Sequence, residues 1–299
     1  MFKGSITALI TPFKNGKVDR DAFARLVDWQ IKEGTSALVP VGTTGESPTL
    51  SSEEHKEVVG LCVEAAKKRV PVIAGTGSNN TAEAIDFAKH AKKAGAEAQL
   101  VVTPYYNKPT QEGLYQHYKA LHDAVELPIV IYNIPPRCVI DMSVETMARL
   151  AKLPRIVGVK DATGDLTRPL KTRIACGSKF SILSGDDGVA LATRAQSGDG
   201  CISVTANIAP RLCADMHKAW EKGDFAAARK LNELLMPLHE ALFVETSPAP
   251  VKWAASQLGL CGSEVRLPMV HATENAQKRV RAAMEHVGLL PAKKAAAAE

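Results

Sequence analysis

The sequence predicts an α/β protein: a closed (β/α)8 barrel, or TIM barrel, followed by a carboxyl-terminal helical domain. Over residues 1–224, short runs rich in β-branched residues alternate with amphipathic stretches of helical period. Eight strand-like runs occur and each is followed by a helical segment, which is the repeat of such a barrel. After residue 224 the strand-like runs stop while the helical period continues.

The expected elements can be followed in chain order. The strand-like runs are ITALITPF, ALVPVGTTGE, PVIAGTG, AQLVVTPYYN, PIVIYNIP, RIVGVKDATG, FSILSGDD and GCISVTANI. The first three helices are expected in DRDAFARLVDWQIKEG, SSEEHKEVVGLCVEAAKKR and TAEAIDFAKHAKKAG. Ser51 and Glu54 form an S-x-x-E capping box at the start of the second helix. An open doubly wound sheet is the alternative, but no strand is followed by G-x-G-x-x-G or a phosphate-binding loop.

Two domains are expected. Residues 1–224 would form the catalytic barrel, and residues 225–299 would form the helical domain. The helical period of the second domain runs from Asp224 to about His286 and ends at the break from Gly288 to Pro291. A short tail of alanine and lysine, PAKKAAAAE, closes the chain.

Composition argues against several classes of protein. With 299 residues, 45% of them hydrophobic and 23% charged, the chain is long enough for one large core. The amino-terminal apolar stretch is too short for a secretory signal and no run could span a membrane, so a cytoplasmic location is expected. The six cysteines form no CxxC pair and the histidines are scattered, so free thiols and no metal are expected. The net charge of +5 is dispersed, which argues against a nucleic-acid partner.

Polar residues follow nearly every predicted strand, where the catalytic groups of a (β/α)8 barrel gather. Turn chemistry explains the glycines, serines and asparagines at these ends. It does not explain Lys160, Tyr132 and Tyr106. These three residues are therefore the first candidates for chemistry.

Lys160 ends an apolar strand, and alternation along the strand places Lys160 and Asp161 on opposite faces. If Lys160 points into the barrel, Asp161 need not neutralise it. Burial among apolar neighbours favours a neutral amine, which is the nucleophile that forms a Schiff base with a ketone. The alternatives are an ion pair with Asp161 or another rim carboxylate, and a point charge that binds phosphate or carboxylate.

Residues on neighbouring strand ends fit imine chemistry. Tyr132 could exchange protons beside the amine, although a core aromatic with a satisfied hydroxyl is the alternative. In GTTGES, the hydroxyls of Thr43 and Thr44 and accessible backbone N–H groups suit a small carboxylate, or form an ordinary turn. Arg137 follows two prolines that stiffen its segment, and its planar fork could bind a carboxylate unless it is simply an exposed loop arginine.

Motifs along nearly the whole chain resemble one enzyme family. They are MFKGSITALITPF, VGTTGES, VTPYYNKPTQEGLYQHY, IYNIPPR, VGVKDATG, LSGDDG, CISVTAN and LFVETSPAPVKWA. Together they resemble the dihydrodipicolinate (4-hydroxy-tetrahydrodipicolinate) synthases, of the pyruvate-dependent class I aldolase group that includes N-acetylneuraminate lyase. The resemblance implies the same barrel with a carboxyl-terminal helical domain. It also implies a lyase that condenses pyruvate with L-aspartate 4-semialdehyde, the first committed step of the diaminopimelate route to L-lysine.

The resemblance implies a role for each matching residue. Lys160 would form the Schiff base with pyruvate, and Tyr132 would be the general acid/base. Thr43 and Tyr106 would complete a hydroxyl relay, with Tyr106 reaching across from a neighbouring subunit of a homotetramer, a dimer of dimers. The substrate-binding positions would be Thr44, Ile202, Gly185 and, for the semialdehyde carboxylate, Arg137. No cofactor would be needed, because the imine itself is the electron sink.

The resemblance also implies inhibition by L-lysine at a site near a subunit interface. The matching positions are Ser47, Pro48, Ser52, His55, Asn79, Glu83 and Tyr105. Pro48 and Ser52 depart from the enterobacterial pattern, and Cys138 stands where many relatives have threonine. For His55 the alternative is an exposed residue in the first turn of a helix.

Two other functions stay open at this point. One is another class I pyruvate-dependent aldolase or dehydratase of the same fold, against which Arg137 argues. The other is a non-catalytic amino-acid-binding barrel, against which the set of Lys160, Tyr132 and Thr43 argues, because binding alone requires no nucleophile.

Overall fold

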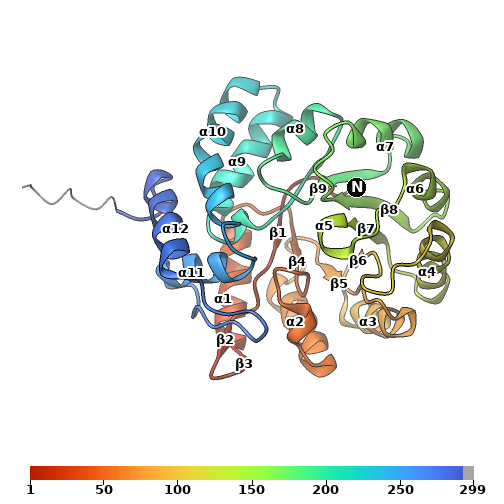
Figure 1. Cartoon of the computed structure of the whole chain (residues 1–299), viewed down its shortest axis with the longest axis horizontal. Helices are drawn as coiled ribbons and strands as arrows, with labels where there is room; N and C mark the ends of the chain where they lie inside the picture. Colours follow the sequence, from red (N-terminus) through yellow and green to blue (C-terminus); the bar gives the residue numbers. More distant parts are fainter. Residues whose placement is uncertain (292–299) are drawn as a thin grey trace, which may run out of the picture.

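Eight parallel strands form a barrel at the centre of the computed structural model, which describes residues 1–291 (Figure 1). The strands are β1 (Gly4–Ala8), β4 (Ala37–Val39), β5 (Ile73–Gly75), β6 (Ala98–Val102), β7 (Ile129–Asn133), β8 (Ile156–Asp161), β9 (Ser181–Ser184) and β10 (Gly200–Ser203). They pair in the order β4-β1-β10-β9-β8-β7-β6-β5, and one bridge between Leu38 and Val72 joins the two ends. The predicted (β/α)8 fold is confirmed.

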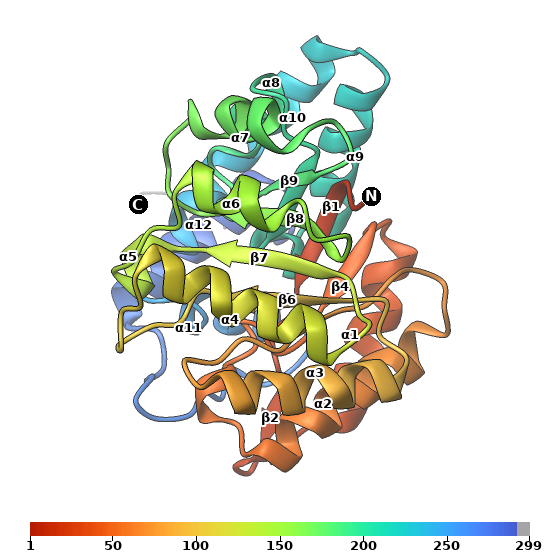
Figure 2. The same ribbon diagram turned by 90° about the vertical axis from the view of Figure 1, so that its right-hand side faces the viewer.

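Helices surround the strands on the outside of the barrel. They are α1 (Arg20–Lys32), α2 (Ser52–Ala66), α3 (Thr81–Ala94), α4 (Gln111–Ala124), α6 (Val144–Leu150), α7 (Arg168–Cys176), α8 (Ala190–Ala195) and α9 (Pro210–Glu221). The predicted capping box is present, because Ser51 Oγ accepts from Glu54 N while the Glu54 side chain accepts from Ser51 N. Figure 2 shows α4 and α6 on the outer side of β7, whose arrow ends at the short helix α5 (Pro135–Cys138).

Two apolar layers hold the barrel together. The outer layer lies between strands and helices and includes Phe23, Leu26 and Leu121, all essentially inaccessible to solvent. The inner layer fills the barrel. Its residues alternate along each strand with the outward-facing strand residues of the outer layer. Its buried members are Ile6, Ala8, Ala37, Val39, Ile73, Ala98, Leu100, Val130, Tyr132, Leu183 and Ile202. The interior is therefore packed, and open space is left at the mouth.

Helices α10 (Phe225–Ala241), α11 (Ala249–Gln257) and α12 (Glu274–His286) follow the last barrel helix. They lie to one side of the barrel in Figure 1, where α10 runs beside α9. Asp224 caps α10 by accepting from Ala227 N. The division into domains of residues 1–224 and 225–299 stays a prediction, and the tail at 292–299 lies outside the described residues. Within residues 1–291, no helix is both long and apolar enough to cross a membrane.

A two-stranded hairpin was not expected from the alternation of strands and helices. Strands β2 (Phe13–Lys14) and β3 (Lys17–Val18) pair antiparallel around Asn15 and Gly16, which both have positive φ. Two-residue strands are too short to show a hydrophobic period. The Asn-Gly dipeptide, which favours a tight hairpin turn, is the signal that could have predicted it.

Candidate active site

Lys160 and Tyr132 are cross-strand partners at the carboxyl ends of β8 and β7. Each residue is 5% exposed, and the Lys160 Nζ atom lies 4.2 Å from the centre of the Tyr132 ring. Gly185, at the end of β9, leaves room for this lysine, because a Cβ there would lie 3.1 Å from Lys160 Cε. The structure thus brings an amine and a phenol together inside the barrel, and of the two orientations that strand alternation left open, Lys160 takes the inward one.

Asp161 points away from this pair. Its Oδ1 accepts hydrogen bonds from Thr163 N (3.0 Å) and Thr163 Oγ1 (2.6 Å), and its Oδ2 lies 3.1 Å from Arg168 Nε. Burial raises the pKa of Asp161, while Thr163 and Arg168 act in the opposite direction. The alternative in which Asp161 neutralises Lys160 is therefore wrong.

A cavity of about 370 Å³ opens at the barrel mouth, and of the Lys160 and Tyr132 pair only Tyr132 is among the residues that line it. Thr43, Tyr132 and Arg137 line it, together with six of the seven positions expected to bind L-lysine: Ser47, Pro48, Ser52, His55, Glu83 and Tyr105. The seventh, Asn79, does not line it; its backbone carbonyl accepts from Asn107 Nδ2 at 2.8 Å. Arg137 and six candidate inhibitor positions thus share one hollow with Thr43 and Tyr132.

Comparison with known proteins identifies the family. The sequence profile of the Dihydrodipicolinate synthetase family matches residues 1–287. The chain belongs to this family. The 4-hydroxy-tetrahydrodipicolinate synthase of Rhodospirillum centenum is 68% identical, over 97% of this chain and 100% of the relative.

Solved structures agree with the family. The dihydrodipicolinate synthase of Acinetobacter baumannii, crystallised in complex with pyruvate, is 47% identical with a TM-score of 0.95, over 97% of this chain and 100% of that chain. The DHDPS of Cyanidioschyzon merolae with lysine bound is 38% identical with a TM-score of 0.94, over 97% of this chain and 99% of that chain.

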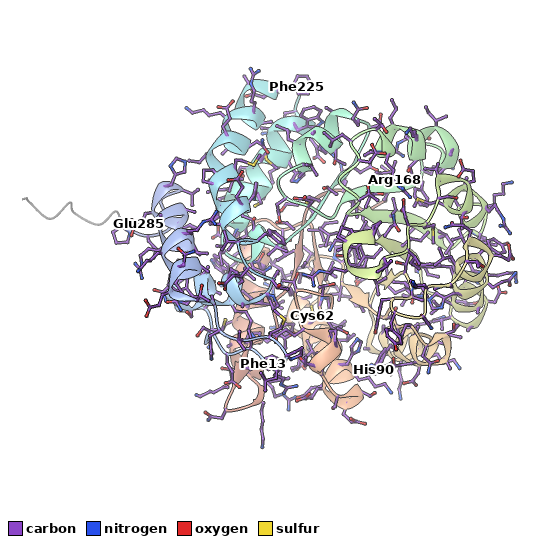
Figure 3. The ribbon with its side chains drawn as sticks, in the orientation of Figure 1. Phe13, Cys62, His90, Arg168, Phe225 and Glu285 are labelled. Carbon is purple, nitrogen blue, oxygen red and sulfur yellow. The ribbon has the colours of Figure 1, made fainter. Side chains whose placement is uncertain are left out.

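In this member of the dihydrodipicolinate synthetase family, the GTTGES loop is anchored from beneath by residues that the sequence analysis missed. Glu46 has φ +57, is buried, and accepts from Lys252 Nζ of α11 at 2.7 Å. Its second oxygen accepts from Arg266 N at 3.0 Å, and Lys252 Nζ lies 4.0 Å from the centre of the Phe13 ring, labelled in Figure 3. A lone lysine in the apolar run SPAPVKWA was the available signal for this buried pair.

The remaining predicted substrate positions differ in accessibility. Thr44 is 5% exposed, and Ile202 is buried in the inner layer on β10. Neither of them, nor Gly185, is among the residues that line the cavity. Arg137 is exposed at the end of α5, which the two prolines begin as one helical turn. Tyr106 is 88% exposed with φ +69, so a single chain does not bring it to Lys160.

The candidate inhibitor positions include a buried histidine. His55 lies in the first turn of α2 but is 3% exposed, and its ring stacks on Phe87 at 3.9 Å between centroids, so the alternative of an exposed residue is wrong. Burial, together with nearby His90, lowers the pKa of His55 to about 4. Glu83 accepts from Ser78 Oγ at 2.5 Å, and burial followed by the Glu83 charge raises the pKa of Tyr105. The neutral imidazole, carboxylate and phenol offer both polar and flat apolar contacts.

Proposed function

We propose that the protein is a lyase that condenses pyruvate with L-aspartate 4-semialdehyde, as a 4-hydroxy-tetrahydrodipicolinate synthase on the diaminopimelate route to L-lysine. The observation that carries the proposal is the buried Lys160 amine beside the Tyr132 ring, with the adjacent carboxylate turned away toward Arg168. Binding alone would not require a buried nucleophile. Family membership and the pyruvate complex of the Acinetobacter baumannii relative support the same reading.

The first half of the proposed reaction loads pyruvate. Lys160 Nζ attacks the ketone carbon, and the oxygen leaves as water after Tyr132 supplies a proton, which gives an imine. This imine forms protonated at nitrogen. The Tyr132 oxygen, which has given up its proton, then takes one from the methyl group, and the nitrogen accepts the electron pair to give an enamine. Thr44 and the main chain near Gly185 and Ile202 would hold pyruvate. No metal or organic cofactor enters these steps.

The second half forms the new carbon–carbon bond. The enamine carbon attacks the aldehyde carbon of the semialdehyde, and the resulting alkoxide takes a proton. The substrate amine then attacks the imine carbon, closes the ring, and displaces the Lys160 amine, which regenerates the enzyme. Arg137 at the cavity wall would bind the carboxylate of this second substrate through its planar fork. That cation favours the semialdehyde over uncharged acceptors of other class I aldolases.

Assembly would complete the site. Tyr106 is exposed beside the cavity, so we propose that a partner subunit's copy joins Thr43 in the proton relay. Leu170 and Ile174 are exposed apolar residues four positions apart on α7, and exposed Leu166 lies just before the helix, which supports a second interface and hence a homotetramer. The free cysteines fit the reducing cytoplasm that we propose as its location.

The decisive test is turnover of pyruvate with L-aspartate 4-semialdehyde by the wild type and by Lys160→Ala. We expect Lys160→Ala to lose at least about 1,000-fold in turnover, because the covalent route is closed. Borohydride reduction in the presence of pyruvate should add the mass of the reduced imine to the wild type and not to Lys160→Ala. The exposed Lys152→Ala is the matched control and should behave as the wild type. A Lys160→Ala protein that turned over normally would contradict the mechanism, and wild-type turnover only with other aldehydes would favour another class I aldolase.

A further inference from the structure

Arg168 occupies a position that is unfavourable for a cation. It is the first residue of α7, where the helix dipole presents its positive end, and it is only 8% exposed. Burial removes hydration that the guanidinium would otherwise keep. Figure 3 labels Arg168 in the upper right part of the molecule, in the region where Figure 1 labels α6, α7 and β8. Contacts that offset both costs must therefore hold the side chain there.

Two carboxylates and a carbonyl make those contacts. Arg168 Nη1 donates to Asp141 Oδ2 at 2.8 Å, and Nη2 donates to the Met142 carbonyl. Nε lies 3.1 Å from Asp161 Oδ2, close enough for charge attraction but without hydrogen-bond alignment. The guanidinium thus joins the strand that carries Lys160 to the segment that follows Arg137.

Asn133 extends the connection to the neighbouring strand. Its Nδ2 donates to Asp141 Oδ1 at 2.7 Å, and its Oδ1 accepts from Met142 N at 3.0 Å. In the β7–β8 register Asn133 faces Asp161, one step beyond the Tyr132 and Lys160 pair. The reactive pair inside the barrel therefore has an outer counterpart, which we call the β7–β8 clamp: Asn133, Asp141, Asp161 and Arg168.

The clamp fixes one end of the segment that carries Arg137. At the other end, Arg137 N and Cys138 N both donate to the Ile134 carbonyl, at 3.1 and 3.0 Å. Between the two anchors, Val139 is 72% exposed with φ +69, so that residue adds little apolar packing to hold the segment. Cys138 is buried and Val139 N donates to the Pro135 carbonyl at 2.8 Å, so the Asp141 anchor adds to these contacts on the carboxyl-terminal side of Arg137.

We infer that Asp141 and Arg168 are positioning residues for the second substrate, which hold Arg137 over the cavity without taking part in pyruvate binding. The inference rests on the proposed function and deepens it. The residues that bind the two substrates would be held in different ways. Lys160, which binds pyruvate, is held within the hydrogen-bonded strands, whereas Arg137, which binds the second substrate, is held through the polar contacts of the β7–β8 clamp.

The test compares Asp141→Asn and Arg168→Met with the wild type in steady-state kinetics and in borohydride trapping of pyruvate. For Arg168→Met, KM for L-aspartate 4-semialdehyde should rise at least about tenfold, as expected when a partly buried charge loses its partner. Asp141→Asn keeps the shape of the side chain, so the same KM should rise less. KM for pyruvate and the yield of trapped imine should change less than about twofold in both variants, because pyruvate binding does not involve the residues of the β7–β8 clamp.

Arg173→Met is the matched control. Arg173 lies on the same helix and, like Arg168, contacts a carboxylate and a backbone carbonyl. Its Nη2 donates to Asp199 Oδ2 at 2.7 Å, and its Nη1 donates to the Phe180 carbonyl at 2.7 Å. Both contacts lie next to the amino-terminal ends of β9 and β10, away from Arg137. Its loss should lower stability without separating the two KM values.

Each outcome decides the inference. Parallel changes in both KM values, or an unchanged semialdehyde KM, would overturn it even though the wild type still forms the pyruvate imine. Absence of the imine from the wild type would instead overturn the proposed function, and the inference with it. If Arg168→Met fails to fold, Asp141→Asn still decides, because the Asp141 side chain is 48% exposed and its substitution is nearly isosteric.

Discussion

Lys160 and Asp161 are adjacent on β8, but their side chains point to opposite faces of the strand and so have different surroundings. Lys160 faces the apolar interior and the Tyr132 ring, whereas Asp161 faces Arg168 and Thr163. Had the two side chains paired, Asp161 would occupy the Lys160 nitrogen that must attack the ketone. A strand end provides this separation because successive residues point to opposite faces.

Also at the residue scale, we predict that L-lysine inhibits turnover through the cavity that Glu83 lines. The lysine-bound relative from Cyanidioschyzon merolae motivates this prediction. Glu83→Gln should raise the half-inhibitory lysine concentration about tenfold, because the inhibitor's cation loses its partner carboxylate. The measurement is a lysine titration of the initial rate, with the exposed Glu53→Gln on α2 as control. Full activity of the wild type in millimolar lysine would remove the inhibitor proposal.

At the scale of elements, the loop after β4 is tied to α11 by the buried Glu46–Lys252 pair. Lys252 is fully buried, and burial lowers its pKa while Glu46 acts to raise it. Lys252→Met should lower the free energy of unfolding by about 3–5 kcal/mol, because the Glu46 charge stays buried without its cation. The denaturant midpoint, read at one protein concentration, measures the effect. The exposed Lys278→Met on α12 should leave it near the wild type.

The double variant Lys252→Met/Glu46→Gln tests the physical reason for that loss. The double variant leaves no unpaired charge buried. Its denaturant midpoint should therefore exceed that of Lys252→Met alone. A lower midpoint in the double variant would mean that packing around α11, rather than charge burial, is responsible. The Thr43 loop would then be held mainly by its other contacts, such as Thr11 Oγ1 donating to the Gly45 carbonyl at 2.7 Å.

For the whole molecule, buried histidines make stability depend on pH. Burial lowers the pKa of His55 and His117 to about 4, and that of His217 to about 3. In the unfolded chain a histidine titrates near pH 6.5, so below that pH the unfolded state binds protons that the folded state does not. Stability is therefore complete above about pH 6.5 and falls as the pH drops toward about 4, by up to about 3 kcal/mol for each histidine.

The slope of stability against pH tests this account. His117→Asn should flatten the slope between pH 6.5 and 4, because one proton-binding site of the unfolded chain is removed. Asparagine can keep the contact that His117 Nδ1 makes with Thr81 Oγ1 at 2.9 Å. His271→Gln is the control: His271 is exposed in the folded protein, and its substitution should leave the slope unchanged. Equal slopes in His117→Asn and the wild type would rule out His117 as a source of the dependence.

The sequence by itself determined the order of strands and helices, the capping box of α2, and the placement of Lys160 and Tyr132 at strand ends and of Arg137 just beyond one. Periodicity reports which face of an element is buried, and turn and cap residues report where it ends. Family motifs then assigned roles that periodicity could not, such as that of Ile202. The short β2–β3 hairpin escaped the pattern because its strands have only two residues each.

Only the tertiary structure decided which side chains meet. It selected Arg168 rather than Lys160 as the partner of Asp161, buried His55 against Phe87, and paired Glu46 with Lys252 across 206 residues of chain. Local sequence patterns carry no information about such partners, because a buried charge can be neutralised by any opposite charge that the fold brings close. The packing of barrel and carboxyl-terminal helices together brought those side chains into contact.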